Sequence, residues 1–311
     1  MAKQSWLTID GVVLLDKPVG LSSNTALQKV RRAYRAAKGG HTGTLDPLAS
    51  GLLPLCLGEA TKFSQMLLDA DKAYVAHVRL GETTTTGDAE GEILVRSELR
   101  PTEANIDAVL PRFLGEIEQI PPMYSALKRD GKPLYEYARA GVELVRAPRQ
   151  VRILSLVRGA LDGQEFDLAV ACSKGTYIRT LAEDIGAALG CGAHITALRR
   201  TRIGPFLIEG AVGLEALESD SALREAALKP VDLLAGHLPV VELDEDQCRR
   251  FAHGQSVTLP AFEPGEARIY RRERFLGLGR CEANGTLVPV RLVAERASSA
   301  QMLDVQENSP L

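Results

Sequence analysis

Apolar residues recur along the first two thirds of the chain in short runs typical of buried strands and in stripes typical of amphipathic helices. Strands are predicted at 11–15, 52–57, 72–80, 151–157, 166–172 and 194–198. Helices are predicted at 60–68, at 102–113, at 177–189 with Thr176 as its cap, and between a cap at Ser22, Ser23 or Asn24 and a stop at 38–40. The irregular order of these elements, with hairpins, predicts an α+β fold on a mixed or antiparallel sheet.

The rest of the chain differs in composition, which predicts a second domain. A linker is predicted at 234–239, followed by a helix near 244–253 and by short strands at 256–259, 268–270, 275–279 and 287–293. We therefore expect a first domain over 1–234, a small, mostly β domain over 235–297 and a disordered polar tail over 298–311. Within the first domain, residues from about 121 to 150 are interpreted as a partly helical, mobile excursion from the core.

Composition narrows the classes of function. No apolar run in the 311 residues could span a bilayer, and the N-terminus lacks the h-region of a secretory signal, so a cytoplasmic location is expected. The five cysteines are scattered without a Cys-x-x-Cys pair, which predicts reduced thiols and no metal site. Neither a Gly-x-Gly-x-x-Gly string nor a P-loop occurs, so no nucleotide cofactor is expected.

Basic residues are clustered, although the net charge of the chain is −3. From Lys17 to Leu45 there are several lysines and arginines and no acid, and further arginine clusters lie at 146–158, 199–202 and 268–274. Any one cluster could be an ordinary solvated surface. Together they predict a polyanion-binding face, as a nucleic-acid-binding protein would have.

The stretch 39–51 presents a single carboxylate, Asp46, on a turn rich in Gly and Pro and close to His41. Glycine allows backbone conformations and close approaches that other residues do not. One interpretation is therefore a reactive carboxylate held towards a ligand. The other is an N-cap for a helix that begins at Pro47, since Asp and a following Pro are common helix starts. The spacing is compatible with both.

Three strings carry a family resemblance. They are Asp16-Lys17-Pro18-x-Gly20-x-Ser22-Ser23, then Gly40-His41-Thr42-Gly43-x-Leu45-Asp46-Pro47-x-Ala49-x-Gly51, and then the stretch 172–179 continued by 190–194 and 198–200. In this order they resemble the bacterial TruB family, which makes pseudouridine at position 55 in the T-loop of tRNA. The resemblance is almost continuous from about residue 11 to residue 202. The C-terminal part is similar, more loosely, to the small PUA-type RNA-binding domain of that family.

The resemblance implies a pseudouridine synthase fold and a catalytic role for one residue. Asp46 aligns with the essential aspartate, which enables cleavage of the glycosidic bond, rotation of the detached uracil and re-attachment through C5. Arg179 is implied to pair with this aspartate, and an adjacent guanidinium would favour the ionised carboxylate. Lys17 belongs to a motif that is implied to be mainly structural. No cofactor and no metal are implied for this isomerisation.

Substrate binding is likewise assigned by resemblance. Tyr74 matches the aromatic residue that stacks on the target base, and His41 matches the histidine that helps to evict the base and contacts the T-loop. Tyr177 and Leu198, together with Arg179, are implied to line the uracil pocket. The segment of about 121–150 resembles the insertion that closes over the RNA loop. The implied partner is the T-arm of tRNA, with no membrane, no obligatory protein partner and a monomeric enzyme.

Each of these residues also has an ordinary structural interpretation. Tyr74 could be a half-buried strand residue, His41 could satisfy a backbone carbonyl, and Leu198 could simply be core. Arg179 could lie on a helix surface. Only their joint occurrence in one ordered pattern favours function.

Two other functions fit parts of the sequence. A non-catalytic RNA-binding protein or tRNA folding chaperone would use the same basic surface, but it would gain nothing from a carboxylate facing RNA. An aspartate-dependent glycosidase would need a second acid near Asp46, and the candidates nearest in sequence are Glu59 and Asp16.

Overall fold

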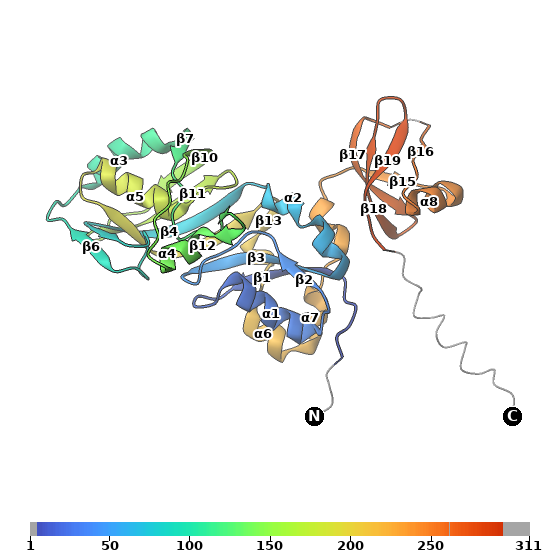
Figure 1. Cartoon of the computed structure of the whole chain (residues 1–311), viewed down its shortest axis with the longest axis horizontal. Helices are drawn as coiled ribbons and strands as arrows, with labels where there is room; N and C mark the ends of the chain where they lie inside the picture. Colours follow the sequence, from blue (N-terminus) through green and yellow to red (C-terminus); the bar gives the residue numbers. More distant parts are fainter. Residues whose placement is uncertain (1–4, 261, 295–311) are drawn as a thin grey trace. The chain divides into compact units, whose positions relative to one another are not determined.

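The computed structural model describes residues 5–260 and 262–294 of the chain (Figure 1). The chain divides into two compact units between Lys229 and Pro230. The predicted linker at 234–239 is wrong in its first residues, because Leu234 and Ala235 are buried in η4 (Val231–Ala235). The predicted tail at 298–311 lies outside the described residues.

One large sheet forms the centre of the first unit. Among the described residues its order is β14-β1-β3-β12-β4-β11-β10-β7, with β2 paired to β3 and β13 paired to β12. The strands are β1 (Gly11–Lys17), β2 (Gly39–His41), β3 (Ala49–Leu57), β4 (Lys72–Leu80), β7 (Gly115–Gln119), β10 (Arg149–Arg158), β11 (Glu165–Cys172), β12 (Ala193–Ile203), β13 (Phe206–Leu207) and β14 (Val212–Gly213). The sheet is mixed, since β3–β12 and β1–β14 are parallel pairs and the others are antiparallel. The predicted α+β class is confirmed.

Helices and small hairpins are attached to this sheet. The helices are α1 (Ser23–Tyr34), η1 (Gly58–Phe63), α2 (Gln65–Leu68), α3 (Glu103–Val109), η2 (Leu110–Phe113), α4 (Leu134–Arg139), α5 (Ile178–Ala188), η3 (Ile208–Gly210), α6 (Leu214–Ser219) and α7 (Ser221–Ala227). The hairpins are β5 (Glu82–Thr84) with β6 (Ile93–Arg96), and β8 (Lys128–Arg129) with β9 (Lys132–Pro133). The last hairpin and α4 lie in the segment of about 121–150, which is partly helical as predicted.

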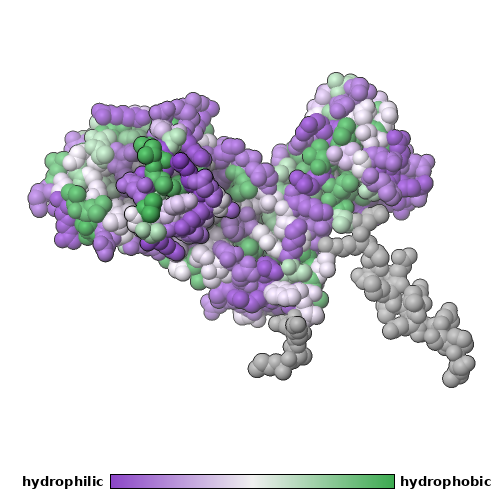
Figure 2. Space-filling model, viewed as in Figure 1, coloured by the Kyte–Doolittle hydropathy of each residue, from purple (hydrophilic) through white to green (hydrophobic). Residues whose placement is uncertain are grey.

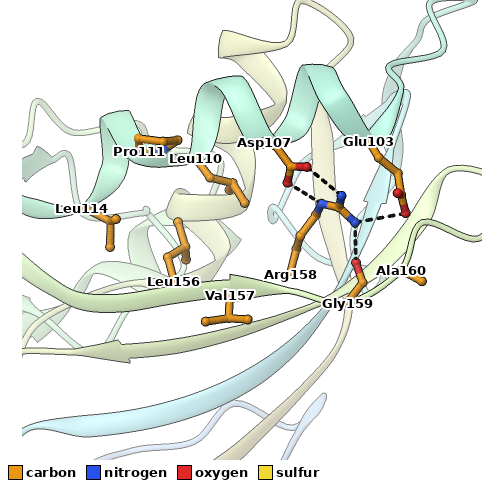
Figure 3. A pocket seen from close by; sticks show the side chains of 10 residues that line it. All are labelled: Glu103, Asp107, Leu110, Pro111, Leu114, Leu156, Val157, Arg158, Gly159 and Ala160. Carbon is orange, nitrogen blue, oxygen red and sulfur yellow. Dashed lines mark hydrogen bonds and ion pairs between the residues drawn. The ribbon is translucent and has the colours of Figure 1, made fainter.

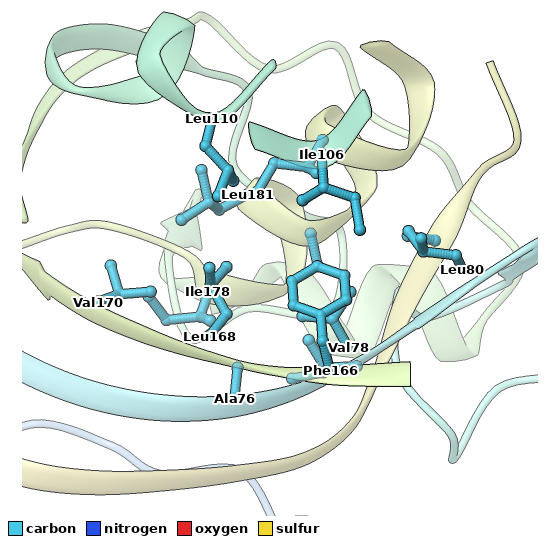
Figure 4. Packing of buried hydrophobic residues seen from close by; sticks show 14 of the residues in the cluster. Ala76, Val78, Leu80, Ile106, Leu110, Phe166, Leu168, Val170, Ile178 and Leu181 are labelled. Carbon is cyan, nitrogen blue, oxygen red and sulfur yellow. The ribbon is translucent and has the colours of Figure 1, made fainter. Parts of the chain in front are cut away.

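Two apolar cores hold the helices on the sheet. In the first, Ile106 and Leu181 from α3 and α5 pack over Phe166 of β11 (Figure 4). In the second, α1 and α6 pack against β1 and β3. Tyr74 and Leu198 pack against both clusters, so they lie where the two cores meet.

Several predicted boundaries are wrong for identifiable reasons. The first helix ends at Tyr34, because Arg35 adopts a left-handed conformation (φ 56°) and caps it before the glycines. Ser22 is its N-cap, accepting from the Thr25 N–H. Thr176 does not cap α5, since its hydroxyl donates to the Ser173 carbonyl. The stretch 102–113 is a short α-helix continued by a 3₁₀ turn.

The second unit is a small β structure with one α-helix among the described residues. Its strands are β15 (Val240–Glu242), β16 (Val257–Thr258), β17 (Gly265–Arg271), β18 (Arg274–Cys281) and β19 (Thr286–Leu292), in the order β15-β17-β18-β19-β16. Helix α8 (Glu245–Ala252) begins with a capping box at Asp244, and its Phe251 is buried in the core. The predicted helix and the four predicted strands are therefore confirmed.

Polar side chains dominate the visible face of the molecule, with apolar residues scattered among them (Figure 2). Apolar side chains gather over β6, where Ile93, Leu94 and Val95 are all exposed. None of the helices in the described part of the chain is long and apolar enough to cross a membrane.

Candidate active site

The turn that carries Asp46 is fixed by the N-terminus of α1. The hydroxyl of Ser23 donates to the Leu45 carbonyl at 3.0 Å and accepts from the Leu45 N–H at 2.7 Å. The Gly20 N–H donates to the Pro47 carbonyl on the other side of Asp46. Residues of the first sequence string thus hold the second string in place on both sides of Asp46. No helix follows Pro47, because the chain enters β3 at Ala49, so the helix-cap interpretation of Asp46 is wrong.

A glycine allows β3 to approach β12 closely beside this turn. Gly51 has φ 102°, and a Cβ there would lie 2.3 Å from the Arg200 carbonyl oxygen. Gly39 and Gly40 do not require such angles, since neither has a positive φ. Only part of the glycine pattern is therefore explained by backbone conformation.

Asp46 pairs with Arg179. The Nη2 atom of Arg179 lies 2.7 Å from Oδ2 of Asp46, and the two side chains are 7% and 42% exposed. Arg179 also donates to the Thr86 carbonyl at 3.0 Å and the Tyr124 carbonyl at 2.7 Å, and its Nε lies 3.5 Å from Oδ2 of Asp88. Because four contacts fix the Arg179 guanidinium, it cannot move with the Asp46 carboxylate. Asp46 is therefore the member of the ion pair that can still contact a ligand.

All of the predicted site residues line one cavity of about 570 Å³. They are His41, Asp46, Tyr74, Tyr177, Arg179 and Leu198. They come from β2, the turn before β3, β4, the start of α5, and β12, so strands and a helix far apart in sequence contribute to one site. Its lining combines apolar and aromatic side chains with the charged groups of Asp46, Lys72, Arg179 and Arg200.

His41 contributes a neutral imidazole to this cavity. Burial, reinforced by the nearby charge of Arg200, lowers the pKa of His41 below its usual value. Its Nδ1 is buried and has no hydrogen-bond partner among the described residues. The ring therefore does not satisfy a backbone carbonyl through that atom.

Arg200 is a component of the site that the sequence analysis quoted without giving it a role. It is 1% exposed, donates to the carbonyls of Leu52 and Gly43, and lines the same cavity. No ion pair within the described ranges joins it to a carboxylate, and its positive charge acts on His41 and Tyr74 of the same cavity. Strand periodicity could have found it, because Leu198 and Arg200 are two residues apart on β12 and share one face.

Two acids far from Asp46 in sequence, Asp88 and Glu90, lie near the Asp46–Arg179 pair. Asp88 is buried behind Arg179 and accepts from the Thr86 hydroxyl and the Glu90 N–H. Burial, then the charges of Asp88 and Asp46, raise the pKa of Glu90. The stretch 83–88 reads as a polar loop, and nothing in its pattern distinguishes a buried acid from a solvated one.

Another hollow of about 590 Å³ lies between α3, η2 and β10 (Figure 3). Its charged end is Arg158, which is bonded to both oxygens of Asp107, to Glu103 and to the Gly159 carbonyl. Because these charges satisfy one another, this hollow has no free group that could act on a substrate.

Thiols and metal ligands form no cluster within the part of the chain that is described. All five cysteines are buried and unpaired, and Cys191 and His194 are core residues. No group of three or more His, Cys, Asp or Glu side chains in the described residues is arranged to hold a metal ion.

Comparison with known proteins assigns the chain to a family. Residues 31–178 match the model of the TruB family pseudouridylate synthase N-terminal domain. Residues 179–235 match the tRNA pseudouridylate synthase B C-terminal domain, and 239–293 match the C-terminal domain of pseudouridine synthase II TruB. The chain belongs to the TruB family of pseudouridine synthases. The pseudouridine synthase fold that the resemblance implied is thereby confirmed.

Named relatives in this family cover almost the whole chain. The tRNA pseudouridine synthase B of Aromatoleum aromaticum is 59% identical over 94% of this chain and 96% of its own length. The protein of the same name from Dechloromonas aromatica is 54% identical over 94% of this chain and 98% of its own. A solved H/ACA RNP bound to a substrate RNA containing 2′-deoxyuridine is 27% identical, with a TM-score of 0.69, over 92% of this chain and 85% of that one.

Lys17 gives a prediction about stability, because the lysine is fully buried next to the site. Its Nζ donates to the carbonyls of Pro18 and Leu21 in the turn before α1, in keeping with a structural role. Burial is the main cause that lowers its pKa from 10.5 to about 8. Between these values the unfolded chain binds more protons than the folded chain, so raising the pH through this window stabilises the fold.

We expect the free energy of unfolding of the parent, minus that of Lys17→Met, to rise by roughly 3 kcal/mol across this pH window. Urea unfolding of both proteins at a series of pH values measures this difference. The contributions of the other titrating groups are the same in both proteins and cancel. A difference that stays flat with pH would show that Lys17 titrates as an exposed lysine does.

Proposed function

We propose that this chain isomerises uridine 55 in the T-loop of tRNA to pseudouridine. The observation that carries the proposal is Asp46, ion-paired to a buried arginine and lining a cavity that also contains Tyr74 and Tyr177. It is supported by relatives at more than half identity over nearly the full length that are named tRNA pseudouridine synthase B. The reaction is an isomerisation, so the enzyme is an isomerase that acts on RNA.

The cavity suggests how the reaction proceeds. A uridine inside a folded loop must leave its stack before its glycosidic bond can be reached, and Tyr74 offers a stacking surface that offsets this cost. His41 would fill the space that the base vacates, and Tyr177 and Leu198 would bound the uracil ring. The N1–C1′ bond then breaks, the ring turns, C5 bonds to C1′, and the C5 proton is lost while N1 gains one.

Asp46 would start this sequence. It acts either as the nucleophile at C1′ or as a general base, and both roles begin from the ionised carboxylate that Arg179 stabilises. No step transfers electrons or phosphate, so we propose a reaction without cofactor or metal. All the groups required belong to this chain.

The RNA-binding surface would extend beyond the cavity. Exposed basic residues of the hairpin at 128–133 lie in the segment of about 121–150, which we propose closes over the T-arm. We further propose that 1–234 is the catalytic domain and that 235–297 is a PUA-like RNA-binding domain. All the predicted site residues belong to one chain, which supports a monomer that acts without an obligatory protein partner. We propose that it acts in the cytoplasm.

Tritium release tests the activity directly. A tRNA transcript labelled with tritium at uridine C5 is incubated with the protein, and label in water is counted. Release stoichiometric with tRNA, and its loss when uridine 55 is replaced by cytidine, is the expected result. Release that persists with the replaced transcript would contradict position 55.

The alternatives give different products. An RNA-binding chaperone would bind the transcript and release no tritium. An aspartate-dependent glycosidase would release free uracil, which chromatography of the small molecules separates from tritiated water. Neither outcome is expected, because the named relatives are pseudouridine synthases.

Replacing the stacking ring should damage chemistry more than affinity. We expect Tyr74→Leu to lower the single-turnover rate by about 10²-fold, because unstacking costs a few kcal/mol that the ring offsets. The tRNA Kd should change by less than about 3-fold, since phosphate contacts dominate affinity. Rapid-quench kinetics and filter binding measure the two quantities. Equal losses in both would assign Tyr74 a general binding or folding role.

A further inference from the structure

Gln119 makes an unusual pair of contacts at the root of the segment of about 121–150. It is the last residue of β7 and is 2% exposed. The Tyr177 N–H donates to its Oε1 at 3.0 Å, and its Nε2 donates to the Tyr177 carbonyl at 3.3 Å. One buried amide therefore satisfies both backbone groups of one residue, as a neighbouring strand would.

These contacts fix the start of α5. Tyr177 is the N-cap of this helix, and no side-chain hydrogen bond of its own caps it. Its carbonyl accepts both from Gln119 and from the Leu181 N–H, which closes the first helical turn. Arg179 lies in that turn, so the position of its guanidinium depends on where Gln119 holds Tyr177.

A second link joins the same two parts of the chain. Five residues after Gln119, the Tyr124 carbonyl accepts from Nη2 of Arg179, the atom that also bonds Asp46. Two prolines, Pro121 and Pro122, stand between the two anchor points and restrict the backbone there. Residue 119 thus bonds residue 177 and residue 124 bonds residue 179, so the two stretches form a clasp that is joined at both ends.

From this clasp we infer that Gln119 is a positioning residue for the isomerisation. It couples the root of the RNA-closing segment to Tyr177 and, through the start of α5, to the alignment of Arg179 with Asp46. Seating of RNA against the segment and alignment of the reacting carboxylate then occur together. The inference rests on the proposed isomerase function.

The test compares Gln119→Leu and Gln119→Glu with Gln65→Leu as a matched control. Gln65 lies in α2, outside both the cavity lining and the RNA-closing segment, and its exposed amide bonds the Asp69 side chain. Single-turnover pseudouridine formation, tRNA affinity and thermal melting are measured for each protein. We expect Gln119→Leu to lower the rate about 10- to 100-fold, because a displacement of about 1 Å can cost that much. The tRNA Kd should stay within about 2-fold, and the control should match the parent.

Gln119→Glu keeps the size of the side chain and gives a readout that loss of packing cannot mimic. Its carboxylate faces the Tyr177 carbonyl without a proton to donate, whereas the protonated acid restores the donor. Burial favours the protonated form, so the rate relative to the parent should recover as the pH falls from about 8 to about 6. If Gln119→Leu does not fold, Gln119→Glu still tests the inference.

The outcomes separate this inference from the proposed function. No pseudouridine from the parent would refute the function itself. If the parent is active and Gln119→Leu has the same rate as the parent, only the inference is overturned. So would a loss of rate matched by an equal loss of affinity, or a Gln119→Glu deficit that does not shrink at lower pH.

Discussion

Asp46→Asn is expected to abolish pseudouridine formation while leaving tRNA binding intact. Asparagine keeps the shape of the side chain and an oxygen that can still accept from Arg179 at the position seen here. It lacks the negative charge that either catalytic role of the residue requires. We expect a rate lower on the order of 10⁴-fold, the upper range for a positioned acid–base group. Tritium release in a single turnover measures it.

Affinity should not fall in parallel, because the substitution removes a carboxylate that RNA phosphates would repel. Asp107→Asn is a matched control. Asp107 also bonds an arginine at 2.7 Å and is similarly exposed, but it lies in the other hollow. An Asp46→Asn protein that releases tritium at the parental rate would remove Asp46 from the mechanism.

The sequence predicted most of the framework of the site because its signals there are local. The Asp46 turn is set by Gly and Pro and by a serine at the start of α1, all of which occur in ordered strings. Strand β4 has the predicted bounds, 72–80, because its apolar run is of strand length and its buried apolar residues, Ala76, Val78 and Leu80, alternate. The cavity residues were named because they occur together in the family pattern.

What could not be predicted depends on contacts between distant segments. Asp88 lies in a polar loop whose burial is created only when that loop packs beside Arg179, more than ninety residues later in the chain. Gln119 ends an edge strand that reads as polar, and its importance comes from where Tyr177 lies. The end of α1 was misplaced because Arg35, rather than a glycine, adopts the left-handed cap.

Arg179→Met should cost stability as well as activity. The substitution leaves Asp88, whose side chain is 3% exposed, without its guanidinium. Removing one partner of a buried ion pair typically costs about 3–5 kcal/mol, since the remaining charge is uncompensated. Asp46 also loses the group that orients it, so we expect a rate lower by about 10²- to 10³-fold, as for the loss of one preorganised donor. Urea unfolding and single-turnover kinetics measure the two effects.

A double variant separates these two consequences, which a single substitution cannot do. In Arg179→Met with Asp88→Asn, the buried charge is gone and the amide can still accept from the Thr86 hydroxyl and the Glu90 N–H. Most of the lost stability should therefore return. Activity should not return, because nothing replaces the guanidinium beside Asp46. If the double variant is as unstable as Arg179→Met alone, Asp88 is not the source of the cost. If it regains activity, Arg179 acts on the fold rather than on the reacting carboxylate.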